Sequence, residues 1–225
     1  VPLLSQPPVK IFVMGANKWR EETAWPPEQA LTRVFYLESG GKANSLSGDG
    51  SLAEGMARKK VADQFVFDPY NPVPTRGGAV CCNPRIFPWG PMDQRPVEQR
   101  KDVLVYSTRP LKHEVEAIGP VQAVLYVASS ARDTAFTAKL VDVFPDGVAR
   151  NLADGILRLR YRNSLEKPEL LKTGEIYRVT VDAGVTSNVF LKGHRIRVEI
   201  SSSNFPRFDR NANTGGPVEQ ATRLL

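Results

Sequence analysis

The sequence has no Gly-x-Ser-x-Gly motif, the tight strand-to-helix turn that lifts a serine nucleophile above an α/β sheet. It also has only two histidines, His113 and His194. His113 begins an alternating stretch, where an exposed position is the ordinary outcome. His194 has the same parity as Ile196 and Ile200, which predicts a buried, hydrogen-bonded histidine on one face of a strand.

A triad of His194 with the serines at 201–203 and Asp209 can still be drawn from the sequence. No glycine-framed nucleophile turn or oxyanion-hole donor accompanies these serines, and a serine without its base is inert near neutral pH. We therefore expect no catalytic residue in this chain.

Cysteine is scarce, because Cys81 and Cys82 are the only two. Their Cα atoms lie about 3.8 Å apart across a trans peptide, below the usual disulfide range of about 4.4–6.8 Å, which predicts two free thiols. Two cysteines without a histidine pair make no zinc site. Four aspartates lack the spacing of a calcium loop, so we expect surface charge or turn capping, and neither a metal nor another cofactor, at Asp63, Asp68, Asp93 and Asp102.

No apolar run is long enough to span a bilayer, which excludes a transmembrane helix and predicts a soluble protein. Residues 1–8 contain neither an initiator methionine nor a basic-then-apolar leader. We expect the chain to start within a longer or processed protein, with a cytoplasmic location favoured over secretion.

The net charge of +6 raises the question of a nucleic-acid partner. Arg158, Arg160 and Arg162 alternate with apolar residues, and so do Arg195 and Arg197. Such alternation predicts solvated strand faces. Because no aromatic ladder interleaves with the arginines, nucleic-acid binding is not expected.

Short strand patterns separated by turn signals fill most of the chain. The predicted strands cover residues 9–15, 32–37, 64–68, 103–106, 113–118, 121–128, 136–144, 155–161, 175–182 and 194–201, with a further short strand inside the loop 39–55. Asp146-Gly147 predicts a type I′ hairpin turn. No long amphipathic helical pattern accompanies them, so we predict an all-β fold, a two-sheet jelly-roll β-sandwich in one domain.

An ordered set of motifs runs along nearly the whole chain: KIFVMG at 10–15, WREE at 19–22 before Trp25-Pro26, DPYNPVP at 68–74, Gly77-Gly78, GPMDQRP at 90–96, DVLVYS at 102–107, TAKLVDV at 137–143, SNVFLKGHRI at 187–196 and SSSNFPRFDRN at 201–211. Together these motifs resemble the C-terminal domain of the X-Pro dipeptidyl-peptidase and cocaine-esterase-like serine hydrolases.

The resemblance implies a jelly-roll domain similar to galactose-binding folds, joined to an α/β-hydrolase domain that carries a Ser-Asp-His triad. Residues 1–8 would be the linker from that absent domain, and residues 9–225 the C-terminal domain, lacking its final strand. The chain would be non-catalytic and inactive alone. It would pack on the hydrolase domain of an acyl esterase or X-Pro dipeptidyl-peptidase and meet the acyl or peptide substrate only indirectly.

The passage 77–95 has no strand or helix period although it contains large apolar residues, and such loops usually carry function. In the family, the segment after the paired glycines helps to line the acyl pocket, which implies that Cys81 or Cys82 faces it. Neighbouring side chains of an extended backbone project to opposite faces, so only one of the two should do so. The alternative is that both are small core residues.

Four aromatic side chains are predicted to contact the hydrolase domain, because aromatics in irregular segments find a partner surface more readily than a local core. The alternative is that they cap the open ends of the sandwich. They are Trp19, Trp25, Phe87 and Trp89.

Two other classes of function stay open. Lectin-like carbohydrate-binding modules share this architecture, and loss of glycan binding in Trp19→Ala or Trp89→Ala would favour that class. A purely structural or dimerising domain is the other, and a homodimer of the parent protein is compatible with it.

Overall fold

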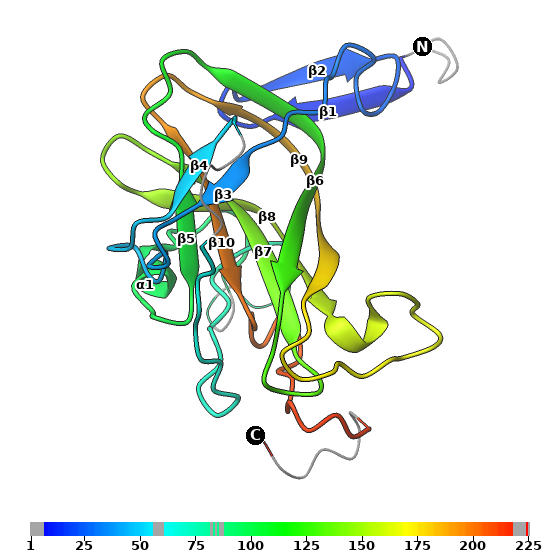
Figure 1. The fold of residues 1–225 in the computed structure, drawn as a ribbon. Helices are drawn as coiled ribbons and strands as arrows, with labels where there is room; N and C mark the ends of the chain where they lie inside the picture. Colours follow the sequence, from blue (N-terminus) through cyan, green and yellow to red (C-terminus); the bar gives the residue numbers. More distant parts are fainter. Residues whose placement is uncertain are drawn as a thin grey trace.

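The computed structural model describes residues 7–55, 61–81, 83, 85, 88–217 and 224, which form two facing β-layers and a projecting hairpin (Figure 1). One layer is a six-stranded sheet in the order β3-β4-β5-β10-β7-β8. Its strands are β3 (Tyr36–Glu38), β4 (Ser51–Ala53), β5 (Leu104–Ser107), β7 (Ala135–Val143), β8 (Ala149–Arg158) and β10 (Arg195–Ser201). The other layer is the antiparallel pair β6 (Val115–Val127) and β9 (Tyr177–Phe190). The predicted all-β sandwich is confirmed, while the jelly-roll and galactose-binding subtype stays a prediction.

The main core lies between the two layers. Phe136, Ala138 and Leu140 of β7 enter it, and so do Ile196 and Ile200 of β10. Every second residue of these strands points inward because side chains alternate along a strand. Yet all nine residues of β7 are buried, so both faces of the six-stranded sheet must be covered.

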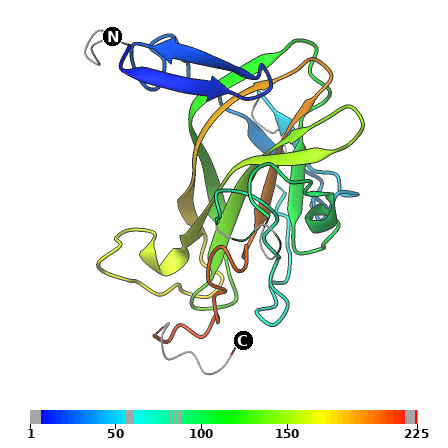
Figure 2. The ribbon, with the colours of Figure 1, turned by 180° about the vertical axis from the view of Figure 1, so that it is seen from behind.

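The second face is covered by described residues of the segment 73–103, which includes the one-turn helix α1 (Arg95–Glu98). Figure 2 shows this segment in front of β7 and β8. Val73 and Val97 of the segment form a small apolar cluster with Val103 and with Val105 of β5. Within the part of the chain that the structure describes, no helix is long and apolar enough to cross a membrane.

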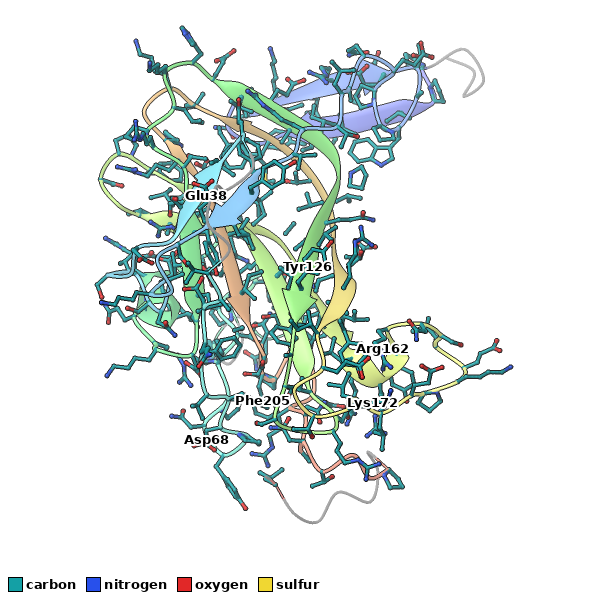
Figure 3. The ribbon with its side chains drawn as sticks, viewed as in Figure 1. Glu38, Asp68, Tyr126, Arg162, Lys172 and Phe205 are labelled. Carbon is teal, nitrogen blue, oxygen red and sulfur yellow. The ribbon has the colours of Figure 1, made fainter. Side chains whose placement is uncertain are left out.

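The layer of β6 and β9 leaves its outer face open to solvent. Tyr126 is exposed near the end of β6, and Arg162 and Lys172 lie in the loop below it (Figure 3). Tyr126 is paired across the strands with Arg178. Inward and outward residues therefore alternate along this layer as expected for a sheet with one covered face.

The hairpin of β1 (Val9–Val13) and β2 (Lys18–Glu22) extends beyond the sandwich (Figure 1). It is joined to β9, since Met14 N donates to Ser187 O at 3.0 Å and Val189 N donates to Met14 O at 2.8 Å. Gly15 follows with φ +78°, and a Cβ there would lie 2.1 Å from the Val189 carbonyl oxygen. Only glycine fits this junction. The sequence predicts β1, but its pattern does not reveal β2.

Several strand boundaries differ from the prediction. Residues 64–68 form no ladder, although Phe65 packs against the main core. The two predicted strands 113–118 and 121–128 are the single strand β6, with a register irregularity between Pro120 and Gln122. Since β6 pairs only with β9 among the described residues, Pro120 lies on an edge strand, where its missing N–H costs no ladder bond.

The predicted strands 155–161 and 175–182 are also corrected. β8 already begins at Ala149, and Leu159–Tyr161 form a short 3-10 turn after it. β9 continues to Phe190 through Gly184, whose φ of +82° is absorbed as a local irregularity of the strand.

The turn between β7 and β8 is not of type I′. Phe144 N donates to Val148 O at 2.8 Å, and Gly147 N donates to Phe144 O at 2.9 Å. Gly147 has φ +87°, whereas Asp146 is not in the left-handed region that type I′ also requires there. The connection is therefore a three-residue hairpin loop with glycine at its left-handed position.

The predicted solvated arginine faces are wrong for Arg160 and Arg197, which are both buried. Arg160 and Arg158 bind the fully buried Asp133, and Arg197 Nη1 lies 2.7 Å from Glu98 Oε2. Alternation identifies two faces of a strand, but it does not tell whether a distant segment covers the second one.

Candidate functional site

The loop 77–91 lies within the irregular passage 77–95 singled out by the sequence, and a pair of glycines closes its base. Gly78 N donates to Gly90 O at 2.9 Å, and Gly90 N donates to Gly78 O at 3.0 Å. A Cβ on Gly77 would lie 2.3 Å from the Gly90 carbonyl oxygen. The two glycines of the Gly77-Gly78 motif are therefore needed for the close approach of two backbone segments.

The loop base lies on a cluster of polar side chains, here called the polar platform: Asp154 of β8, Asn204 and Arg207. Asp154 Oδ1 lies 2.9 Å from Arg207 Nη1, and Asp154 Oδ2 accepts a hydrogen bond from Asn204 Nδ2 at 2.8 Å. Burial raises the pKa of Asp154, which the neighbouring Arg207 opposes. A Cβ on Gly78 would lie 2.7 Å from Arg207 Nη1, so the loop base rests directly on this ion pair.

Replacement of Gly77 by alanine is expected to destabilise the protein more than replacement of Gly147, although both residues have positive φ. Gly147→Ala meets no atom within 4 Å, so it costs only the left-handed backbone strain of about 1–2 kcal/mol. Gly77→Ala adds a clash with a backbone carbonyl and should cost about 1 kcal/mol more through the lost Gly78–Gly90 bonds. Urea unfolding of both variants measures the difference, and equal losses would contradict this account of the loop base.

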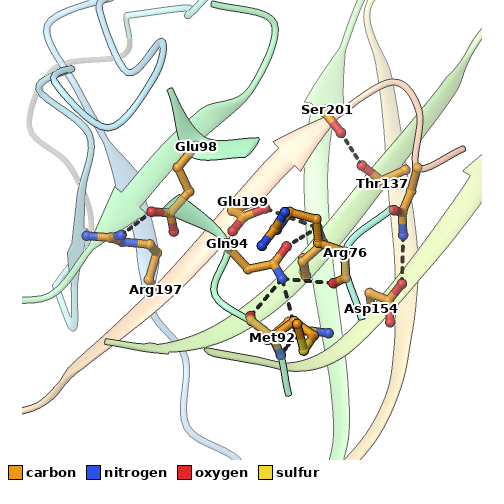
Figure 4. A network of polar contacts seen from close by, with 12 residues as sticks. Arg76, Met92, Gln94, Glu98, Thr137, Asp154, Arg197, Glu199 and Ser201 are labelled. Atoms are coloured by element: carbon orange, nitrogen blue, oxygen red, sulfur yellow. Dashed lines mark hydrogen bonds and ion pairs between the residues drawn. The ribbon is translucent and has the colours of Figure 1, made fainter. Parts of the chain in front are cut away.

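Four charged side chains form a buried layer between the six-stranded sheet and helix α1, here called the charged layer: Glu98, Lys139, Arg197 and Glu199 (Figure 4). Lys139 Nζ lies 3.3 Å from Glu199 Oε2. Arg197 binds Glu98 and also donates through Nε to Ser107 Oγ at 2.7 Å. The layer therefore contains two cations and two acids, each cation paired with one acid.

The two acids of the charged layer also interact with each other. Burial raises the pKa of Glu199 to about 7, Lys139 opposes this rise, and the charge of Glu98 and a hydrogen bond with it add to the rise. Glu98 Oε1 and Glu199 Oε1 otherwise have no donor among the described groups. One proton shared between the two carboxyls would satisfy both oxygens.

His194 is buried and hydrogen-bonded, as the sequence predicts. Its Nδ1 lies 2.9 Å from Asp142 Oδ1, and its ring centre lies 4.5 Å from that of Phe144. Burial raises the pKa of Asp142, while His194 opposes this rise. This pair lies at the start of β10, whereas Ser201 lies at its end.

The serines of the triad that was considered from the sequence have other hydrogen-bond partners. Ser201 Oγ and Thr137 Oγ1 are 2.6 Å apart, and Ser203 Oγ accepts a hydrogen bond from Val73 N at 2.8 Å. Among the described residues, Ser201 and Ser203 are thus bonded to Thr137 and Val73, and His194 to Asp142, so these serines and this histidine are not arranged as nucleophile and base.

The other predicted site residues lie on two separate elements. Trp19 is 64% exposed on β2 and makes an edge-to-face contact with Phe12 at 5.5 Å, and Trp25 follows at 39% exposure. Trp89 is 48% exposed and lies in the loop 77–91. The structure brings Trp19 close to Phe12 on the hairpin, away from the loop that carries Trp89.

Cys81 lies in the same loop and is disulfide-bonded, so the prediction of a free thiol is wrong for it. Cys82 and Phe87 lie outside the described residues.

The charged layer is the part of the site that the sequence analysis missed. One signal was available: Lys139 stands in the middle of an otherwise largely apolar strand, and a lysine at such a position is almost never fully buried unless it is paired. Its partner Gln94, and Glu98, the partner of Arg197, lie in a segment without periodicity, so no pattern connects them to the strands.

Comparisons with known proteins identify the family and the fold of the chain. The family described as the X-Pro dipeptidyl-peptidase C-terminal non-catalytic domain matches residues 4–224. The chain is 52% identical over 217 residues to a cocaine esterase of Rhodococcus, a match that covers 96% of the chain and 37% of the esterase.

Two solved structures share the fold. An aminopeptidase from a marine sediment Thaumarchaeota archaeon superimposes with a TM-score of 0.81 at 32% identity, covering 96% of this chain and 36% of the aminopeptidase. An alpha-amino acid ester hydrolase superimposes with a TM-score of 0.82 at 29% identity, covering 95% of this chain and 36% of the hydrolase. The chain thus spans little more than a third of the length of these relatives.

Proposed function

Because the chain belongs to the family of X-Pro dipeptidyl-peptidase C-terminal non-catalytic domains, we propose that it packs on an α/β-hydrolase domain and forms one wall of the substrate pocket of a serine hydrolase. In this proposal residues 9–225 are the domain, and residues 1–8 connect it to the hydrolase domain. The partner would correspond to the part of the longer relatives that this chain does not cover.

The observation that carries the proposal is the loop 77–91 on its polar platform. Its base is held by the Gly78–Gly90 bonds and by the ion pair of Asp154 and Arg207, while Trp89 near its end is half exposed. A wall that orients a substrate needs a fixed base and an apolar surface, because misplacement of a reacting group by about 1 Å can cost about 100-fold in rate. We propose that Cys81 or Cys82 of this loop faces the pocket.

The exposed aromatic residues support contact with a partner domain. Trp19 and Phe12 expose a joint aromatic surface on the β1–β2 hairpin, with Trp25 close by in sequence. Aromatic side chains contribute much of the energy of protein interfaces when a partner covers them. We propose that Trp19, Trp25, Phe87 and Trp89 lie at the interface with the hydrolase domain.

The chemistry would be acyl transfer in the other domain. A serine there would attack the acyl carbonyl and form a serine ester, which water would then hydrolyse. The names of the relatives point to esters and amides, since one is a cocaine esterase, one an aminopeptidase and one an alpha-amino acid ester hydrolase. The contribution of this chain would be to orient the acyl group and to exclude water from the pocket.

We expect the isolated chain to show no turnover of chromogenic esters or Xaa-Pro substrates. When it replaces the corresponding third of the Rhodococcus cocaine esterase, to which it is 52% identical, the chimaera should hydrolyse esters. The matched control is the same esterase with that third deleted. Steady-state kinetics of the three purified proteins test the proposal.

Turnover by the isolated chain that survives purification would contradict the non-catalytic assignment. A deleted esterase as active as the chimaera would contradict the pocket wall. In the chimaera, Trp89→Ala should raise KM, whereas a change confined to thermal stability would place Trp89 at the interface rather than in the pocket.

A further inference from the structure

Gln94 connects the two ends of the loop 77–91. Its side chain is fully buried, and its Nε2 donates to Arg76 O at 2.9 Å and to Met92 O at 2.9 Å. Arg76 precedes the loop and Met92 follows it. A single side-chain amide therefore lies across the base of the loop, next to the Gly78–Gly90 bonds.

The same amide joins the loop base to the six-stranded sheet. Nε2 also lies 3.1 Å from Asn151 Oδ1 on β8, and Oε1 accepts a hydrogen bond from Lys139 Nζ on β7 at 2.8 Å (Figure 4 shows Gln94 within this network). Asn151 Oδ1 in turn accepts a hydrogen bond from Met92 N at 2.8 Å. The loop base is thus bonded to two strands through one residue.

An amide matches these partners in character, and its two N–H groups are shared among the three acceptor oxygens. Three acceptor oxygens surround Nε2, and one ammonium group faces Oε1, so the orientation of the amide is determined by its surroundings. A carboxylate would turn an oxygen toward the three acceptors. An apolar side chain would remove a donor from the carbonyls of Arg76 and Met92 and an acceptor from the Lys139 ammonium, and the loss of hydrogen bonds by buried polar groups is costly.

We propose that Gln94 is the positioning residue that determines where the loop 77–91 stands on the domain, and hence the shape of the pocket wall. The pocket part of this inference rests on the proposed function, whereas the positioning of the loop does not. The hydrogen bonds of Gln94 fix the position of the loop base relative to β7 and β8. The position of the exposed residues of the loop depends on that base.

The test compares Gln94→Glu and Gln94→Met with Gln99→Glu, a control at an exposed position of the same segment. Amide hydrogen exchange of the full chain is measured at Gly78 and Gly90, which bond to each other, and at Leu140 and Ile200 as core references. We expect both Gln94 variants to lose protection at the two glycines by about tenfold or more with little change at the references, because the loop base opens locally. Gln99→Glu should leave all four amides unchanged.

The positioning role would be overturned if protection from exchange fell equally at the glycines and at the references, or stayed unchanged at the glycines. Failure of both Gln94 variants to fold would overturn it too. The chimaera separates the pocket from the loop. Gln94→Glu there should raise KM by about threefold or more at nearly constant kcat, as expected when a binding contact common to ground and transition states is lost. Altered exchange with unchanged KM would keep the positioning role and reject the pocket wall of the proposed function.

Discussion

Replacement of Asp133 by asparagine is expected to lower the free energy of unfolding by about 3–5 kcal/mol, because it leaves guanidinium groups without their buried counter-charge. Asp133 is fully buried, and its Oδ2 accepts hydrogen bonds from Arg158 Nε and Arg160 Nε, both at 2.9 Å. Arg158 also binds Asn211 Oδ1, and Arg160 binds Gly216 O. The residues after β10 should therefore loosen together with the cluster.

Guanidinium chloride or urea unfolding measures the effect, with a lower midpoint and an unchanged slope as the expected result. Asp209→Asn is the matched control, since Asp209 is exposed and its replacement should change the unfolding free energy by less than about 0.5 kcal/mol. Equal effects of the two substitutions would show that the Asp133 cluster does not stabilise the fold.

Replacement of Glu199 by glutamine is expected to remove a pH dependence of stability. The folded-state pKa of Glu199 is raised to about 7 by burial, against an ordinary value of 4.5. Between these values the folded state keeps a proton that the unfolded chain has released. Its contribution to stability is present below about pH 4.5 and is lost as the pH rises toward 7, with a total on the order of 3 kcal/mol.

The glutamine variant should thus be more stable than the wild type at pH 8 and similar to it at pH 5. The amide keeps an acceptor for Lys139 and offers a donor to Glu98, the two charged groups that face Glu199 from β7 and α1, while Arg197 of the same strand stays bound to Glu98. Chemical denaturation at both pH values measures this, with Glu166→Gln at an exposed position as control. Parallel pH profiles of wild type and Glu199→Gln would contradict the role of Glu199.

The strands that carry their own pattern could be predicted from the sequence. β7 and β10 alternate between core residues and residues of the opposite face, and both lie close to their predicted positions. The sequence predicts two strands in place of β6, because a Gly-Pro pair such as Gly119-Pro120 usually marks a turn. The structure tolerates the proline there because the neighbouring edge of β6 is unpaired among the described residues.

The site was predictable only in part. Periodicity sufficed for His194, since its neighbours on β10 fix its face. The charged layer and Gln94 could not be found in this way, because α1 is a single turn without a helical period, and its polar contacts with the sheet lie beside only one small apolar cluster. Pairing of Lys139 with Gln94, and of Arg197 with Glu98, joins residues far apart in the sequence, and no local rule contains this information.

The Gly78–Gly90 bonds also bear on how such domains can diverge. These bonds close the intervening segment at the loop base, and the contacts that hold the loop base come from residues outside that segment. Insertions, deletions or exchanges between the two glycines can therefore accumulate without disturbing the underlying sheet. Natural selection or laboratory evolution can therefore exchange the segment between Gly78 and Gly90 while the sheet beneath it stays the same.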